Sequence, residues 1–85
     1  MSKKLFVGNL NWKVTTEQLQ ELFEEFGQVE DAVIILDPQR RSKGFGFVTF
    51  ANDEDADKAI SELHEKEFEG RNMIVNEARP PKPRD

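Results

Sequence analysis

The chain has no cysteine, which excludes disulfide bridges and thiolate metal sites. No apolar run approaches the roughly 18 residues that a membrane-spanning helix needs. The first four residues lead directly into an alternating segment and not into the apolar centre of a signal peptide. These absences predict a cytoplasmic protein, or a nuclear one if the source is eukaryotic. With 85 residues, the chain has room for one small domain with one modest core.

An excess of positive charge is also missing, because the formal net charge is −5 at neutral pH. This balance argues against a nucleic-acid partner, since affinity for the phosphate backbone comes largely from Lys and Arg. The acidic residues are unevenly distributed, however. Residues 16–26 and 53–65 hold ten acidic residues and one basic residue, and the rest of the chain holds seven acidic and eleven basic ones. If those two segments form one layer, the opposite face is mildly positive.

Both acidic segments have the periodicity of amphipathic helices. In the first, Thr15 and Gln18 have capping-box spacing and Gly27 ends the pattern. Its apolar residues recur at helical spacing: Leu19, Leu22, Phe23 and Phe26. The second helix is expected to begin at Asn52 or Asp53, and its inner face holds Ala56, Ala59, Ile60 and Leu63.

Four other segments have the alternation of strands, at about residues 3–10, 29–36, 44–50 and 72–77. In the second strand, Ala32, Ile34 and Leu36 alternate with Val33 and Ile35, and in the fourth, Met73 and Val75 are the expected inward residues. The order of elements predicts an α+β fold, a ferredoxin-like βαββαβ sandwich. Its four-stranded antiparallel sheet would carry both helices on one face.

Residues 43–50 place two aromatic rings on one face of a strand. Side chains in a strand alternate between its faces, so Phe45 and Phe47 share one face while Val48 and Phe50 take the other. Only one face of the sheet can be covered by two helices. One of these pairs must therefore lie in the core and the other must face solvent.

The first strand decides which pair is exposed. In residues 3–10, Leu5 and Val7 lie on one side and Lys4 and Phe6 on the other. The lysine indicates the solvated face, and Phe6 shares that face. The sequence thus predicts three exposed rings on one sheet surface.

The two ring-bearing segments resemble the paired motifs of the RNA recognition motif family. Residues 43–50 fill every position of the octamer Lys/Arg-Gly-Phe-Gly-Phe-Val-x-Phe, and residues 5–10 match the hexamer Leu-Phe-Val-Gly-Asn-Leu. The resemblance covers residues 3–79 and is strongest to single-domain members of the bacterial and glycine-rich plant types. Residues 80–85 are expected to form a Pro-rich, basic, extended tail.

This resemblance implies binding of single-stranded RNA, with single-stranded DNA as an alternative. Phe6 and Phe47 would each stack under a base, Phe45 would lie against riboses, and Lys43 would contact a phosphate. Further phosphate contacts are expected from Lys4, Arg40 and Arg41, and Arg79 with Lys82 would close over the RNA strand as the tail orders. For the two arginines of the turn, a purely solvated role is the alternative.

Four more residues are assigned to the exposed face. Asn9 and Asn76 would contact base edges, and Val33 and Ile35 would pack against bases. The resemblance implies a monomer without catalysis, cofactor or metal. Its role would be post-transcriptional, in regulation or RNA chaperoning.

Two rival functions use the same fold. Val33, Ile35 and Ile74 form an apolar patch that could bind a protein partner. An enzyme is the second rival, because some ferredoxin-like sandwiches are catalysts, but the chain has no cysteine and a single histidine. That histidine, His64, is interpreted as a solvated residue at a helix end. Trp12 either stacks on a base at the sheet rim or, as the favoured interpretation, packs against the start of the first helix.

Overall fold

The computed structural model describes residues 3–39 and 42–78, without the side chains of Ser42 and Lys43. In chain order the elements are β1 (Lys3–Gly8), α1 (Thr16–Glu24), β2 (Val29–Leu36), β3 (Ser42–Phe50), α2 (Asp53–Leu63), β4 (Glu67–Phe68), β5 (Arg71–Asn72) and β6 (Ile74–Glu77). The expected tail of residues 80–85 lies outside the described residues.

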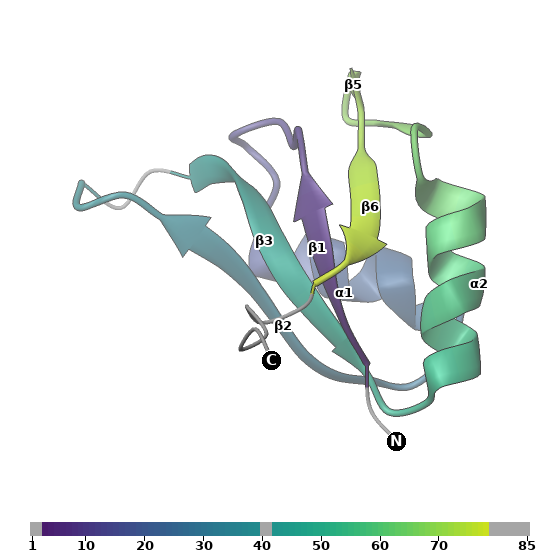
Figure 1. The fold of residues 1–85 in the computed structure, drawn as a ribbon. Helices are drawn as coiled ribbons and strands as arrows, with labels where there is room; N and C mark the ends of the chain where they lie inside the picture. Colours follow the sequence, from purple (N-terminus) through teal and green to yellow (C-terminus); the bar gives the residue numbers. More distant parts are fainter. Residues whose placement is uncertain (1–2, 40–41, 79–85) are drawn as a thin grey trace, which may run out of the picture.

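The main sheet has four strands in the order β2-β3-β1-β6, and each neighbouring pair is antiparallel. Both helices lie on the same side of this sheet (Figure 1). The predicted ferredoxin-like βαββαβ fold is confirmed. Within residues 3–39 and 42–78, no helix lies over the opposite face of the sheet.

Helix α1 begins with the predicted capping box. The Gln18 backbone N–H donates to the Thr15 hydroxyl, and the Thr15 N–H donates to the Gln18 side-chain oxygen, both at 3.1 Å. Helix α2 begins after Asn52, which makes no side-chain cap bond to the backbone. Three acidic residues in its first turn interact favourably with the positive end of the helix dipole. Neither helix is long and apolar enough to cross a membrane, and this holds for every helix in the described ranges.

The core lies between the helices and the sheet. Its buried apolar residues come from every major element: Leu5, Val7, Leu10, Val14, Leu19, Phe23, Ile34, Val48, Phe50, Ala56, Ala59, Leu63, Met73 and Val75. The rings of Phe23 on α1 and Phe50 on β3 lie 6.1 Å apart between their centroids. The alternation predicted for β1 and β3 is therefore correct.

Strand β2 departs from simple alternation at its end. Leu36, expected on the same face as Ile34, is 52% exposed. The pairing of β2 with β3 shifts in register between these two residues. Such an irregularity bends the strand and changes which face a side chain takes.

The predicted fourth strand is divided in the structure. Residues 71–72 form β5, which pairs with β4 in a small separate hairpin, and β6 alone joins the main sheet. At the sheet edge, the Val75 backbone N–H donates to Nδ1 of His64 at 3.1 Å. His64 therefore satisfies a backbone donor of an edge strand. The interpretation of His64 as merely solvated missed this role.

Gly46 is required where β2 pairs closely with β3. A Cβ atom at this position would overlap the backbone carbonyl oxygen of Val33 and lie 3.1 Å from the Cα atom of Ile34. Since both obstacles are backbone atoms, no side-chain rotation can relieve the overlap. We expect Gly46→Ala to lower the free energy of unfolding by about 1 to 3 kcal/mol, as overpacking typically does.

Urea denaturation followed by circular dichroism measures this loss, and Gly46→Val should lose more than Gly46→Ala. Equal stability of the alanine variant and the wild type would show that β2 can move away from β3 at no cost.

Candidate nucleic-acid interface

Three phenylalanine rings lie next to one another on the uncovered face of the sheet. Phe6 on β1 is paired in register with Phe47 on β3, and Phe45 lies two residues earlier on β3. The ring centroids are 5.7 Å apart for Phe6 and Phe45, 5.9 Å for Phe6 and Phe47, and 6.4 Å for Phe45 and Phe47. All three rings are partly exposed and none belongs to the core. We call these three residues the aromatic platform.

Gly8 leaves space for one ring of the platform. A Cβ atom at this position would lie 2.7 Å from the nearest atom of the Phe6 ring. The Phe6 ring thus extends along β1 above Gly8, toward the end of the strand. A side chain at position 8 would push it away.

The residues beside the platform differ on its two sides. Asn76 on β6 is the register partner of Phe6, and Val33 on β2 is the partner of Phe47, so both lie on the platform face. Asn76 is exposed, Val33 is 38% exposed, and Ile35 is half-buried. An amide therefore borders the rings on one side and aliphatic groups on the other.

Two neighbouring lysines of β1 have different surroundings. The Lys4 ammonium lies 4.8 Å from the centroid of the Phe47 ring, on the platform face. The Lys3 ammonium lies instead 2.7 Å from Asp57 and 4.0 Å from Glu77. Its hydrogen bond to Asp57 raises the pKa of Lys3. Lys4 thus brings positive charge to the platform, whereas the charge of Lys3 is matched by carboxylates of the helix side and the sheet edge.

The other predicted contacts of basic residues with RNA are not tested by the structure. Arg40, Arg41, Arg79 and Lys82 lie outside the described residues, and so does the side chain of Lys43. Their roles stay predictions.

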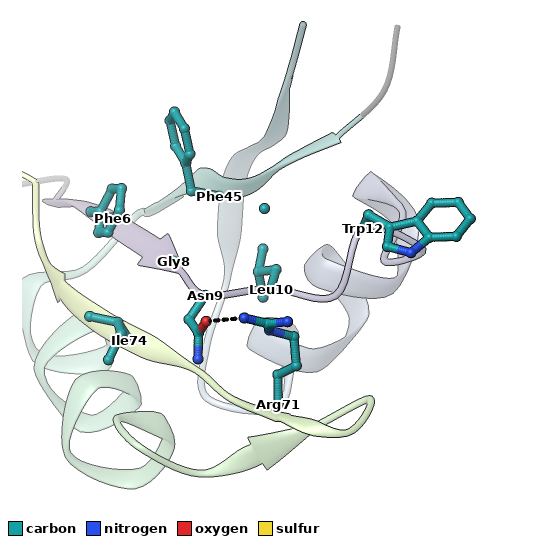
Figure 2. A pocket seen from close by; sticks show the side chains of 9 residues that line it. Phe6, Gly8, Asn9, Leu10, Trp12, Phe45, Arg71 and Ile74 are labelled. Atoms are coloured by element: carbon teal, nitrogen blue, oxygen red, sulfur yellow. Dashed lines mark hydrogen bonds between the residues drawn. The ribbon is translucent and has the colours of Figure 1, made fainter.

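Asn9 is held by residues of the β4–β5 hairpin. Its backbone is left-handed, with φ at 56°. Its Nδ2 donates to the Asn72 carbonyl at 2.7 Å, and its Oδ1 accepts from the guanidinium of Arg71 at 2.7 Å (Figure 2). Both polar atoms of Asn9 are thus engaged within the protein, while its predicted contact with a base edge stays untested. The link joins residues 62 and 63 positions apart, so no local sequence pattern indicates it.

A hollow of about 510 Å³ begins where the platform ends. It lies among the end of β1, the start of β3, the loop after β1 and the β4–β5 hairpin. Its lining residues are Phe6, Gly8, Asn9, Leu10, Trp12, Gly44, Phe45, Arg71 and Ile74.

Trp12 lies at the rim of this hollow and is 67% exposed. The favoured interpretation, in which it packs against the first helix, is therefore wrong. Asn11 fixes the loop, since its Oδ1 accepts from the Lys13 N–H at 2.9 Å and its Nδ2 donates to the Glu69 carbonyl at 3.1 Å. The indole points away from the other labelled residues of the hollow (Figure 2).

Comparison with known proteins agrees with this geometry. The family model described as the RNA recognition motif matches residues 5–74. The chain belongs to the RNA recognition motif family. The resemblance noted from the two motifs is confirmed, and the family is one of RNA-binding proteins and not of enzymes.

Several relatives of this RNA recognition motif are glycine-rich RNA-binding proteins. Glycine-rich RNA-binding protein 1 of Mycosarcoma maydis is 46% identical over 79 residues, which are 92% of this chain and 45% of the relative. The mitochondrial glycine-rich RNA-binding protein 2 of Arabidopsis thaliana is 47% identical and aligns with 99% of this chain and 55% of its own length. The chain spans about half the length of these curated relatives.

Among solved structures, the crystal structure of RNA Binding Protein PG1 is similar over its whole length. The TM-score is 0.88 at 44% identity, and the alignment covers 94% of this chain and 99% of that one. The chain therefore shares its fold with that RNA-binding protein.

The exposure of Trp12 can be tested by fluorescence, because this RNA recognition motif has a single tryptophan. We expect the folded protein to emit close to the wavelength of free tryptophan in water and to be quenched efficiently by acrylamide. Unfolding in urea should change both properties little. A blue-shifted emission that acrylamide hardly quenches would contradict the exposed position.

Proposed function

We propose that this RNA recognition motif binds short single-stranded RNA by stacking bases on the aromatic platform. The observation that carries this proposal is the placement of three adjacent rings on the sheet face opposite helices α1 and α2. Stacking of a base on an aromatic side chain contributes roughly 1 to 3 kcal/mol and depends little on which base it is. Three rings can hold two or three nucleotides.

The charge distribution supports a modest affinity. Lys4 lies on the platform face, but helices α1 and α2 on the other face are rich in acidic residues. Because the chain has few basic residues for a nucleic-acid binder, with a net charge of −5, stacking would supply much of the binding free energy. We expect a dissociation constant of micromolar order, about 8 kcal/mol of binding free energy, that weakens as salt increases.

A role in post-transcriptional regulation or RNA chaperoning, carried out by a monomer, is the proposed cellular function. It is supported by the names of the glycine-rich RNA-binding relatives. Other relatives bear the words mitochondrial and chloroplastic in their names, so the cytoplasmic location stays a prediction.

A protein partner on the same face is the second candidate. The predicted patch of Val33, Ile35 and Ile74 is accessible in part, since Val33 is 38% exposed and the other two residues are half-buried. Exposed aliphatic groups of this kind are common in protein interfaces. This candidate requires binding of a protein that depends on these aliphatic residues and not on the rings.

Stacking can be separated from simple apolar contact at one ring. Phe47→Leu keeps an apolar side chain but removes the π face, whereas Phe47→Tyr keeps the ring. We expect Phe47→Leu to weaken binding of labelled random-sequence RNA roughly tenfold, the size of one stacking interaction, and Phe47→Tyr to bind nearly as well as wild type. Fluorescence anisotropy measures both affinities.

Replacing Phe6, Phe45 and Phe47 together by Ala should abolish measurable binding in a protein that circular dichroism shows to be folded. Leu36→Ala is the control, because Leu36 is exposed but lies outside the platform. Wild-type affinity in the triple variant would refute the platform, and an equal loss of RNA affinity in Leu36→Ala would show that the loss is not specific to the rings. Titration with DNA of the same length tests the alternative ligand.

A further inference from the structure

Arg71 brings a positive charge to the hollow at the end of the platform. The guanidinium lies on the opposite side of the hollow from Phe45 (Figure 2). The hollow shares Phe6 and Phe45 with the platform. A strand of RNA that leaves these rings at the end of β1 would therefore enter the hollow.

The charge of Arg71 is not neutralised by the group that holds it. Its guanidinium donates to the amide oxygen of Asn9, which is neutral, and no carboxylate within residues 3–39 and 42–78 forms an ion pair with it. Lys3 shows the opposite arrangement, with its ammonium against the Asp57 carboxylate. A guanidinium has five N–H donors, so one hydrogen bond leaves others for a ligand.

The hairpin that carries Arg71 is held at its turn and at the end of β5. Asn9 binds the Arg71 side chain and the next residue's carbonyl, and Asn11 binds the carbonyl of Glu69. These bonds tie the hairpin to the loop after β1. Because the guanidinium is held before any ligand arrives, less conformational entropy is lost when a ligand binds.

We propose that this hollow is a further nucleotide subsite, in which Arg71 contacts a backbone phosphate of the RNA as the strand leaves the aromatic platform. Asn9 is then a positioning residue that acts through Arg71, and not a reader of base edges. The proposal rests on RNA binding by the platform. The planar fork of a guanidinium matches phosphate oxygens, and the volume of about 510 Å³ lies within the range of small-ligand sites.

The contribution of Arg71 should depend on RNA length. A probe of about three nucleotides occupies only the three rings, whereas a probe of about eight nucleotides extends past them. We expect Arg71→Ala to lower the affinity for the longer probe about fivefold to tenfold and to leave the affinity for the shorter probe unchanged. The slope of log affinity against log salt for the longer probe should fall by about 0.7, the value for one phosphate of a single strand.

Lys58→Ala is the matched control. Lys58 is exposed on α2, on the helix side of the sheet, and its replacement also removes one positive charge. It should change neither the length dependence nor the salt slope beyond a small nonspecific effect. Arg71→Lys keeps the charge without the fork and should fall between wild type and Arg71→Ala.

The role of Asn9 is tested by a double-mutant cycle with Asn9→Gly. Glycine accepts the left-handed backbone without strain, so this variant removes the side-chain contacts alone. If Asn9 acts through Arg71, Asn9→Gly should reproduce the lower salt slope, and the variant with both changes should bind no worse than Arg71→Ala. Additive losses would show that Asn9 contacts the RNA independently, which would overturn its assignment as a positioning residue.

Trp12 gives a second, independent signal, because it is at the rim of the hollow. The longer probe should change its fluorescence and the shorter one should not. The subsite is refuted if Arg71→Ala binds both probes as wild type does while the triple platform variant loses binding. If the triple platform variant itself binds normally, the proposed function fails first, and the two failures are thus distinguished.

Discussion

The structure depends on one constraint, which is that two helices can cover only one face of a four-stranded sheet. Strand side chains alternate, so each residue facing away from the helices must be solvated or must bind something. The two central strands, β1 and β3, place Phe6 opposite Phe47 on that uncovered face. Each ring is partly shielded by the other two, whose centroids lie no more than 6.4 Å from its own. The cluster reduces its exposed apolar area yet keeps surface for a flat ligand.

The platform and the hollow beside it are built in different ways. The rings stand on paired strands, so their spacing is set by the backbone ladder. The hollow is walled by a loop and a two-stranded hairpin, and its shape depends on side-chain hydrogen bonds made by Asn9 and Asn11. A ligand contact on the rings is therefore fixed by the fold, whereas a contact in the hollow is fixed by a few amides and is more easily altered by substitution.

The sequence was sufficient to predict what alternation and capping determine. The exposed rings, the buried Val48 and Phe50, and the capping box of α1 follow from patterns within ten residues. The shift of register that exposes Leu36 arises from pairing with another strand, which a single strand's pattern cannot show. The contact between Asn9 and Arg71 joins positions 62 residues apart. Such links depend on how loops meet after folding, and local periodicity has no information about them.

Net charge describes this surface poorly, because what matters is which cations have anionic partners. Lys3 and Lys4 are adjacent in the sequence, yet the first is bound by Asp57 and the second lies over an exposed ring. Arg71 is held by a neutral amide. The acidic residues of α1 and α2 lie on the opposite side of the sheet. At physiological salt, interactions between exposed charges are screened beyond a Debye length of roughly 8 Å, so these carboxylates act mainly on their own side. A chain of net charge −5 can thus present positive charge at the face that carries the aromatic platform.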